Sequence, residues 1–202
     1  MNRIVARALV LVPRILLGLW AAAVLVVGSY LLAGHLLTLP KPESADERLA
    51  TGIASVRTSQ NEGRWLVLHV LYTECGCSKR VLDHLLSRGA DPFAIERVVL
   101  VGGDDATAAK IRAAGYQYEA VTDATLESRY GVTAAPLLVI ADPTNAVRYV
   151  GGYSDRKQAE KIRDLETFAR LVKGETPDPL PVFGCAIAKK LQDTVDPLGL
   201  RR

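Results

Sequence analysis

The most constraining feature of the chain is an uncharged run of 26 residues, from Ile15 to Pro40, that is rich in Leu, Val and Ala. As a helix, at about 1.5 Å per residue, this run would be roughly 39 Å long. About 20 apolar residues are enough to cross a bilayer. A signal peptide has a shorter apolar stretch, of ~7–15 residues, and a small-residue cleavage site. No clean site of that kind precedes Lys41. The run therefore predicts an uncleaved transmembrane anchor that contacts the bilayer through residues 15–39.

The charges on either side of this run predict its orientation. Arg3, Arg7 and Arg14 precede it without an acidic residue among them, whereas residues 41–48 carry both signs. Positive charge favours the cytoplasmic side of a membrane span. We therefore expect a single-pass protein of the inner (cytoplasmic) membrane, with its C-terminal part in the periplasm or otherwise outside the cytoplasm.

The remainder of the chain carries no net charge. The three N-terminal arginines account for the net charge of +3, which leaves 22 basic and 22 acidic residues after them. Aromatic residues make up only 6% of the chain. Nucleic-acid binding depends on a basic surface, so this balance excludes nucleic acid as a partner. The 49% hydrophobic content is ample for one core.

Four segments are expected along the chain. A Ser44-Ala45-Asp46-Glu47 capping box predicts a linker helix with Leu49, Ile53 and Val56 on one face. A proline-rich stretch at residues 176–181 predicts the end of the folded domain. The expected boundaries are a cytoplasmic tip and anchor at 1–40, a linker helix at 41–60, a domain at 61–175 and a C-terminal extension at 176–202.

Strand and helix patterns alternate within the expected domain. Trp65 to Tyr72 is a nearly continuous apolar run, typical of a strand buried on both faces of a sheet. The next segment has helical spacing and ends at Arg88-Gly89. The alternation predicts an α/β fold with a parallel sheet. Further expected elements are strands at 97–101, 137–140 and 147–150, helices at 105–114, 123–130 and 155–172, and a C-terminal helix carrying Ile187, Leu191 and Val195.

Two of the three cysteines form a Cys75-Gly76-Cys77 pair between the first strand and its helix. A helix N-terminus stabilises a thiolate, and Lys79 and Arg80 add positive charge nearby. We therefore expect Cys75 to be the nucleophile and Cys77 the thiol that resolves a mixed disulfide. A disulfide across one residue closes a small ring, and strain makes such a bond easier to reduce.

The strand, the cysteine pair, the helix and the segment Tyr130 to Ile140 (YGVTAAPLLVI) together resemble the thioredoxin superfamily over residues 65–172. The resemblance implies that Pro136 is cis and faces the cysteines. It also implies that Ala135 presents its backbone to the substrate. The expected fold is thus thioredoxin-like, with an N-terminal transmembrane helix and a short C-terminal helical extension.

A catalytic histidine is also implied by the resemblance. His69 stands six residues before Cys75, where thioredoxins place a buried acid that takes a proton from the resolving cysteine. A histidine can accept that proton, although a core histidine with satisfied hydrogen bonds is the alternative. The chain departs from the family in its C-x-C spacing, in lacking a preceding tryptophan and in having Leu137 after the proline.

The third cysteine, Cys185, follows Val182-Phe183-Gly184 and is expected at the start of the last helix. This string, with the C-x-C-Ser motif, resembles membrane-anchored thioredoxin-like proteins labelled RedB. Cys185 is either a third thiol at the site or a small buried apolar residue.

The sequence thus predicts a membrane-anchored thiol–disulfide oxidoreductase that uses Cys75 and Cys77 on protein dithiols or disulfides outside the cytoplasm, without a cofactor or resident metal. One alternative resembles the SCO copper metallochaperones, with Cys75, Cys77 and Cys185 as Cu(I) ligands. The distant histidine ligand of those proteins is missing, since no histidine follows His84. The other alternative is a non-catalytic interaction module.

Overall fold

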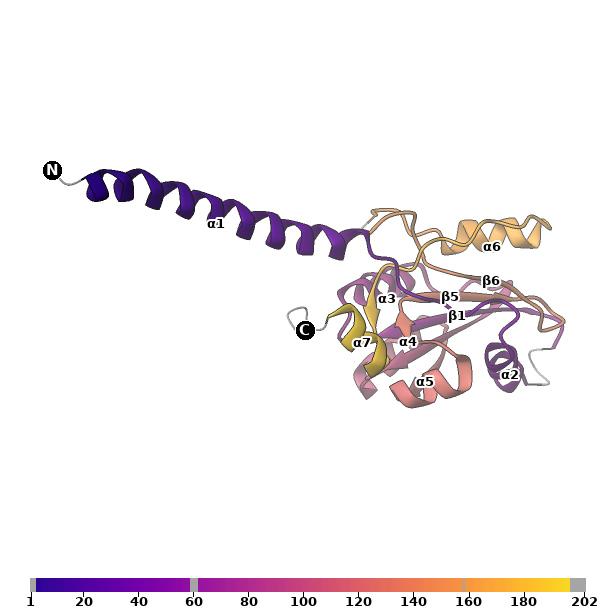
Figure 1. Cartoon of the computed structure of the whole chain (residues 1–202). Coiled ribbons are helices and arrows are strands. Elements are labelled where there is room, and N and C mark those ends of the chain that lie inside the picture. The colour runs from indigo at the N-terminus through magenta and orange to yellow at the C-terminus, as the bar shows by residue number, and fades with distance from the viewer. Residues whose placement is uncertain (1–2, 59–61, 158, 197–202) are drawn as a thin grey trace. The chain divides into compact units, whose positions relative to one another are not determined.

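The computed structural model describes residues 3–58, 62–157 and 159–196, and the chain divides into two compact units, Met1–Leu37 and Thr38–Arg202. The first unit contains one helix, α1 (Arg3–Leu36) (Figure 1). Its segment Val12–Tyr30 spans 19 residues with a mean hydropathy of 1.8. This segment is therefore long and apolar enough to cross a membrane, as an N-terminal signal sequence also can be.

The second unit is built on a five-stranded sheet with the order β3-β2-β1-β5-β6 (Figure 1). The first three strands run parallel, β5 runs antiparallel to β1, and β6 runs antiparallel to β5. The central position of β1 explains its nearly continuous apolar sequence. The strands are β1 (Trp65–Tyr72), β2 (Ala94–Val101), β3 (Gln117–Val121), β5 (Leu137–Ala141) and β6 (Val147–Gly151).

Helices cover both faces of this sheet. Leu66, Leu68 and Val70 of β1 belong to a core shared with α2 (Glu47–Ser55) and α5 (Asp123–Tyr130). The alternate residues of β1 face the other side of the sheet, because side chains along a strand alternate in direction. That second core contains residues of α3 (Gly76–Arg88), α4 (Asp105–Ala113) and α6 (Asp164–Val172). The expected α/β fold is confirmed.

Three sequence expectations about these elements are wrong. Strand β3 was not expected, because its half-buried residues show no clear apolar alternation. The helix expected at 155–172 begins only at Asp164, because the backbone folds back so that Arg163 N–H donates to Tyr153 C=O at 2.9 Å. The N-cap of the linker helix, α2, is Asp46 and not Ser44. The Asp46 carboxylate accepts a hydrogen bond from Arg48 N–H at 2.8 Å.

The C-terminal segment differs most from expectation. Cys185 lies in a short strand, β7 (Cys185–Ala186), that pairs antiparallel with β4 (Ala134–Ala135). The last helix, α7 (Lys189–Val195), begins after it. The placement of Cys185 at a helix start is therefore wrong. Backbone pairing outweighs the helical spacing of the apolar side chains here, and Ile187 N–H donates to Thr133 C=O at 2.8 Å.

The expected linker helix at 41–60 and the described part of the C-terminal extension both pack onto the expected 61–175 domain. Leu49 and Ile53 of α2 are fully buried in the core, and so is Val182 of the C-terminal segment. Leu39 N–H donates to Val182 C=O at 2.8 Å, which joins the two flanks by their backbones. The compact unit thus begins at Thr38 and includes both the linker helix and the C-terminal extension.

Candidate functional site

The candidate site lies where the end of β1 meets the start of β5. Val70 is paired with Leu137, so Pro136 comes beside the turn that carries Cys75. The Ala135–Pro136 peptide bond is cis, as the resemblance implied. A cis proline before an antiparallel strand, opposite a cysteine at a strand-to-helix junction, decides the fold. Residues 38–196 have a thioredoxin-like fold.

No family model matches the chain, and no curated protein matches it. Several solved structures of low sequence identity resemble this thioredoxin-like unit. A hypothetical protein from Sinorhizobium meliloti is 15% identical, with a TM-score of 0.48 over 76% of this chain and 91% of that one. A secreted Mycobacterium tuberculosis disulfide oxidoreductase, described as homologous to E. coli DsbE, is 17% identical, with a TM-score of 0.44 over 64% and 99%. The thioredoxin domain of a thiol–disulfide oxidoreductase from Bacteroides vulgatus is 14% identical, with a TM-score of 0.38 over 56% and 81%.

Cys75 is the N-cap residue of α3 and is completely buried. Its thiol points at the carbonyl oxygen of Ala135, with 3.7 Å between sulfur and oxygen. Hydrogen bonding from the thiols of Cys185 and then Cys77 lowers the pKa of Cys75, and this outweighs the opposing effect of burial. The backbone N–H of Ser78 adds to the lowering. A helix N-terminus supplies such an amide, whereas the main stabilisation comes from thiols rather than from Lys79 and Arg80.

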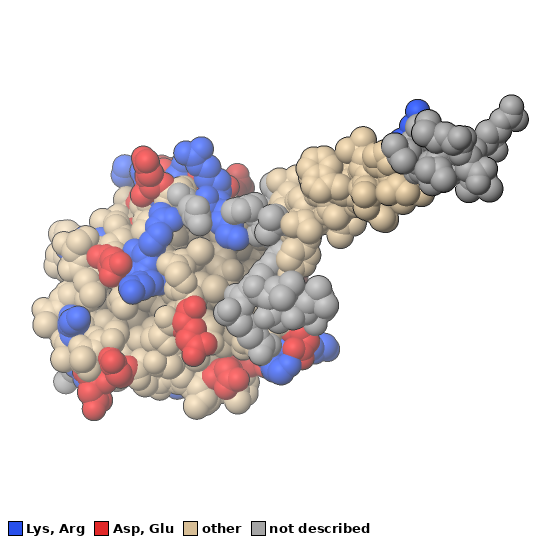
Figure 2. All heavy atoms as spheres, turned by 90° about the vertical axis from the view of Figure 1, so that its left-hand side faces the viewer, with Lys and Arg blue, Asp and Glu red and all other residues tan. Residues whose placement is uncertain are grey.

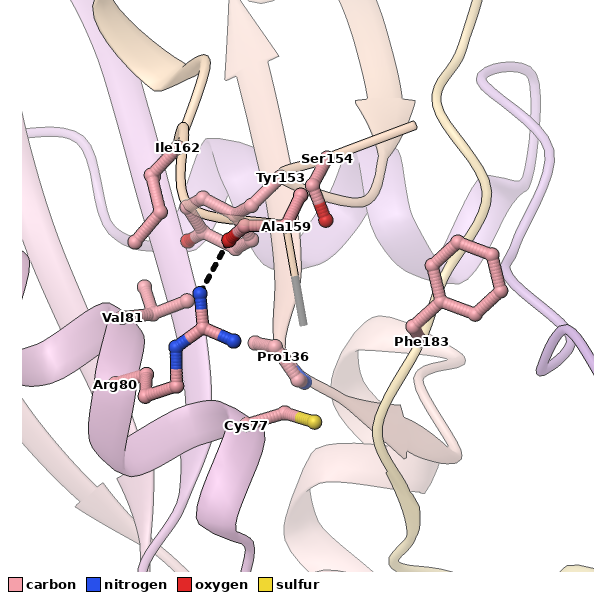
Figure 3. A pocket seen from close by; sticks show the side chains of 9 residues that line it. All are labelled: Cys77, Arg80, Val81, Pro136, Tyr153, Ser154, Ala159, Ile162 and Phe183. Atoms are coloured by element: carbon pink, nitrogen blue, oxygen red, sulfur yellow. Dashed lines mark hydrogen bonds between the residues drawn. The ribbon is translucent and has the colours of Figure 1, made fainter. Parts of the chain in front are cut away.

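Cys77 is half-buried in the first turn of α3. The neighbouring Cys75 thiol and burial raise the pKa of Cys77, against the opposing positive charges of Lys157 and Arg80. Cys77 is therefore the protonated member of the pair at neutral pH. It lines a small pocket, in which Pro136 is drawn near its sulfur and Phe183 stands farther away (Figure 3). The pocket is lined by Cys77, Arg80, Val81, Pro136, Tyr153, Ser154, Ala159, Ile162 and Phe183.

Cys185 is the third thiol of the site. It is half-buried, and its partner across the β4–β7 pair is Ala135. The Cys75 thiol and burial raise the pKa of Cys185, so it is a hydrogen-bond donor at neutral pH. All three cysteines are unpaired in the structure. The fold thus brings Cys185 to the expected pair from a position more than a hundred residues later in the sequence.

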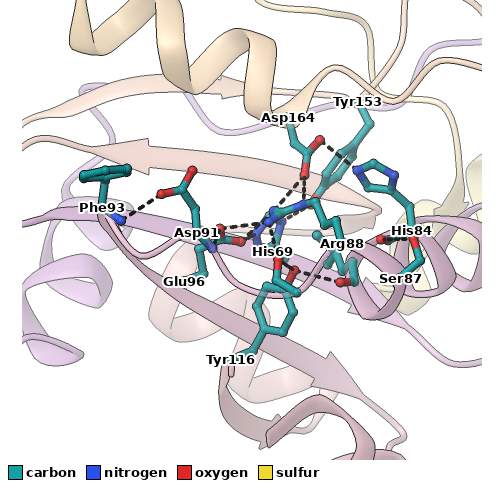
Figure 4. A network of polar contacts seen from close by, with 12 residues as sticks. His69, His84, Ser87, Arg88, Asp91, Phe93, Glu96, Tyr116, Tyr153 and Asp164 are labelled. Atoms are coloured by element: carbon teal, nitrogen blue, oxygen red, sulfur yellow. Dashed lines mark hydrogen bonds and ion pairs between the residues drawn. The ribbon is translucent and has the colours of Figure 1, made fainter. Parts of the chain in front are cut away.

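His69 lies beneath this site, with no exposed surface and with both ring nitrogens occupied. Its Nε2 is 2.8 Å from the Glu96 carboxylate and its Nδ1 is 2.9 Å from the Tyr153 hydroxyl (Figure 4). Although burial opposes it, hydrogen bonds from His69 and Arg88 lower the pKa of Glu96 to about 2, so Glu96 only accepts hydrogen bonds. Burial raises the pKa of Tyr153 well above 10, which keeps its hydroxyl protonated. These partners assign the proton to Nε2 and leave Nδ1 as an acceptor for Tyr153.

Arg88 extends this buried network. Its guanidinium binds both oxygens of Glu96, at 3.0 and 2.6 Å, and also reaches Asp164 at 2.9 Å. Asp164 in turn lies 3.1 Å from Nε2 of His84, whose side chain is partly buried. Sequence reasoning missed Arg88, Glu96, Tyr153 and Asp164. The one available signal was an acidic residue, Glu96, within an apolar strand.

Two further features of the described residues concern possible ligands: the distribution of charged side chains on the surface and the grouping of side chains that can bind metal. On the face drawn in Figure 2, acidic and basic side chains are interspersed and no broad basic surface is present. Within residues 3–58, 62–157 and 159–196, no three His, Cys, Asp or Glu side chains are grouped so as to hold a metal ion.

Proposed function

We propose that the protein is a membrane-anchored thiol–disulfide oxidoreductase acting on protein thiols or disulfides outside the cytoplasm. The observation that carries the proposal is the position of Cys75. It caps a helix, its pKa is lowered, and its sulfur faces the backbone just before a cis proline. A thiolate at such a place is the attacking group that disulfide exchange requires.

The proposed reaction proceeds in two exchanges. The Cys75 thiolate attacks one sulfur of a partner disulfide, forms a mixed disulfide and releases the other partner sulfur as a thiolate. Cys77 then loses its proton and attacks Cys75 Sγ, which releases the second partner thiolate and leaves a Cys75–Cys77 disulfide. The partner gains two electrons, the cysteine pair loses two, and the reverse sequence oxidises a partner dithiol.

We expect Ala135 and Pro136 to align the partner chain in this reaction. Ala135 sits next to both Cys75 and the cis bond, and its backbone is already used for antiparallel pairing. A partner strand that paired with the same backbone would bring its sulfur to Cys75. Holding reacting groups in place in this way converts a bimolecular exchange into an effectively unimolecular one.

A trapping experiment tests the proposed function. In cells, the full-length Cys77→Ser/Cys185→Ser variant should accumulate protein mixed disulfides at Cys75, because both thiols that neighbour Cys75 and could release the partner are missing. The Cys75→Ser/Cys185→Ser variant, made at equal level, is the matched control and should trap none. Adducts should appear on a non-reducing gel and disappear with reductant. Equal trapping by both variants would contradict the assignment of Cys75 as the attacking thiol.

The location of the domain is part of the proposal. It is supported by the apolar segment Val12–Tyr30 and by the arginines that precede residue 15. We expect an alkaline phosphatase fused after Arg202 to be active in cells, because that enzyme needs an oxidising compartment. A green fluorescent protein fused at the same place serves as the opposite reporter. A fluorescent fusion with an inactive phosphatase fusion would place the domain in the cytoplasm instead.

We further propose that His69 takes the Cys77 proton through the Tyr153 hydroxyl. Tyr153 lines the same pocket as Cys77, and its hydroxyl contacts His69 Nδ1, the ring nitrogen that carries no proton. His69→Gln should therefore raise the pH midpoint of Cys77 alkylation by about one unit, and Tyr153→Phe should raise it similarly. An unchanged pH profile in both variants would leave His69 as a packing residue only.

A further inference from the structure

The thiol of Cys75, the nucleophile of the proposed reaction, is inaccessible to solvent in the structure. Cys75 has 0% exposed surface, whereas Cys77 and Cys185 are half-buried. A partner disulfide cannot reach a sulfur that has no exposed surface. Some element must therefore move before Cys75 attacks another protein, and the neighbours of Cys75 identify it.

The C-terminal strand occupies the backbone that a partner would use. Ala135 pairs with Cys185 in the antiparallel β4–β7 ladder, and the Cys75 thiol points at the carbonyl of the same Ala135. Antiparallel residues directly opposite each other have Cβ atoms about 4.5–5.5 Å apart. Cys185 therefore stands where the cysteine of a partner strand would stand.

The segment around Cys185 is shaped for this close approach. A Cβ atom on Gly184 would overlap the carbonyl oxygen of Ala135 and lie 2.6 Å from Pro136 Cδ. Only glycine lets the backbone come this near. Before Gly184, the buried Val182 accepts a backbone hydrogen bond from Leu39, and after it, Ile187 donates one to Thr133. The segment is thus fixed by hydrogen bonds on both sides of Gly184, and Gly184 itself packs against Ala135 and Pro136.

The two neighbours of Cys75 are not equivalent. Cys77 is two residues from Cys75, in the first turn of the helix that Cys75 caps, so a disulfide between them closes a small ring whose strain makes it easier to break. Cys185 approaches from a separate strand that converges with Cys75 on Ala135. Interaction with Cys185 is also the largest influence on the ionisation of Cys75, ahead of that with Cys77. The geometry therefore favours Cys185 as the partner sulfur in the closed protein.

We infer that residues 182–186 occupy the position that a strand of a partner protein would take. We also infer that Cys185 displaces Cys77 from its disulfide with Cys75 once the pair is oxidised. The inference rests on the proposed function, which supplies the Cys75–Cys77 disulfide. Cys185 loses its proton and attacks Cys75 Sγ, so that the Cys75–Cys77 bond breaks as the Cys75–Cys185 bond forms. Cys77 leaves as a thiolate and takes up a proton. No external oxidant or reductant is consumed, and the strand must leave Ala135 before another protein engages.

Disulfide mapping on the unmodified full-length chain tests the exchange. The protein in detergent is oxidised with glutathione disulfide, quenched in acid, alkylated and digested, and its linked peptides are quantified by mass spectrometry. A peptide joining Cys75 to Cys185 should make up at least about a tenth of the oxidised protein, because the two bonds interconvert by simple exchange. Oxidised protein in which Cys185 is always a free thiol would overturn the inference but leave the proposed function intact. Protein in which Cys75 forms no disulfide would overturn the proposed function itself.

Displacement of the strand is tested separately on the reduced full-length chain. Gly184→Ala should lift the strand from Ala135 and make Cys75 react with iodoacetamide about tenfold faster or more, because local opening then costs less. Gly28→Ala is the matched control, since its added methyl meets nothing within 4 Å, and it should leave the rate unchanged. A Gly184→Ala rate equal to that of the control would contradict a covering role for the strand. If Gly184→Ala does not fold, the mapping on the unmodified chain decides.

Discussion

The Cys75→Ser variant is expected to lose thiol–disulfide exchange almost completely, with a rate roughly 10³-fold or more below that of the wild type. A serine hydroxyl is not ionised at neutral pH, whereas the pKa of Cys75 is lowered by the thiols of Cys185 and Cys77. The rate is measured as single-turnover reduction of a protein disulfide by the reduced full-length protein in detergent. The fall should appear in the bimolecular rate constant.

Cys77→Ser/Cys185→Ser is the informative comparison for this result. It keeps the attacking thiolate and loses both neighbouring thiols that could release the partner, so it should form the mixed disulfide and then stop. One partner thiol per protein molecule would then be released instead of two. A Cys75→Ser variant that retains the wild-type rate would refute the assignment, and a Cys77→Ser/Cys185→Ser variant as slow as Cys75→Ser would refute the separation of roles.

The second large effect is expected from Arg88→Met, which should lower the free energy of unfolding by about 3–5 kcal/mol. Arg88 neutralises Glu96 and Asp164, whose side chains are almost completely buried. Methionine keeps much of the side-chain volume and removes the charge, which leaves two buried carboxylates without their cation. Urea unfolding followed by tryptophan fluorescence measures the change, because Trp65 packs edge-on against Phe168 in the same core.

Arg170→Met provides the matched control for that experiment. Arg170 pairs with Glu175 at 2.7 Å, but both side chains are about half-exposed. Exposed ion pairs contribute little to stability because water and salt screen them. The control should therefore unfold at nearly the wild-type urea concentration. Equal shifts for the two variants would mean that the Arg88 network is not a main source of stability.

The elements that could be predicted from the sequence are those marked by apolar patterns and capping residues within the element itself. The apolar run Trp65–Tyr72 became β1 with the same bounds, and the helix from Gly76 ends at Arg88 as its glycine stop indicated. The C-terminal glycine of α5, Gly131, has the left-handed conformation, with φ of 66°, that such a stop requires. Capping residues and apolar periodicity act within a few residues, so they are readable from the chain.

The missed parts depend on contacts between distant segments. The spacing of Ile187, Leu191 and Val195 correctly predicted a C-terminal helix, but that helix begins only at Lys189, because pairing with residues 133–135 makes residues 185–186 a strand. No pattern within residues 185–186 or their neighbours in the sequence predicts that pairing. The same holds for Arg88 and Asp164, which are 76 residues apart and meet only because α3 and α6 cover one face of the sheet. Cys75, Cys77, Ala135 and Pro136 are adjacent in the structure, as the family resemblance implied.

A redox titration of Cys75 tests the central claim most directly. The full-length protein in detergent is equilibrated across glutathione buffers, quenched in acid and alkylated, and the fraction of Cys75 that remains a thiol is read by mass spectrometry. The account predicts that Cys75 passes reversibly from thiol to an intramolecular disulfide in one two-electron transition, whichever of Cys77 and Cys185 is its partner. A Cys75 that remains a thiol in every buffer, in folded protein, would contradict it.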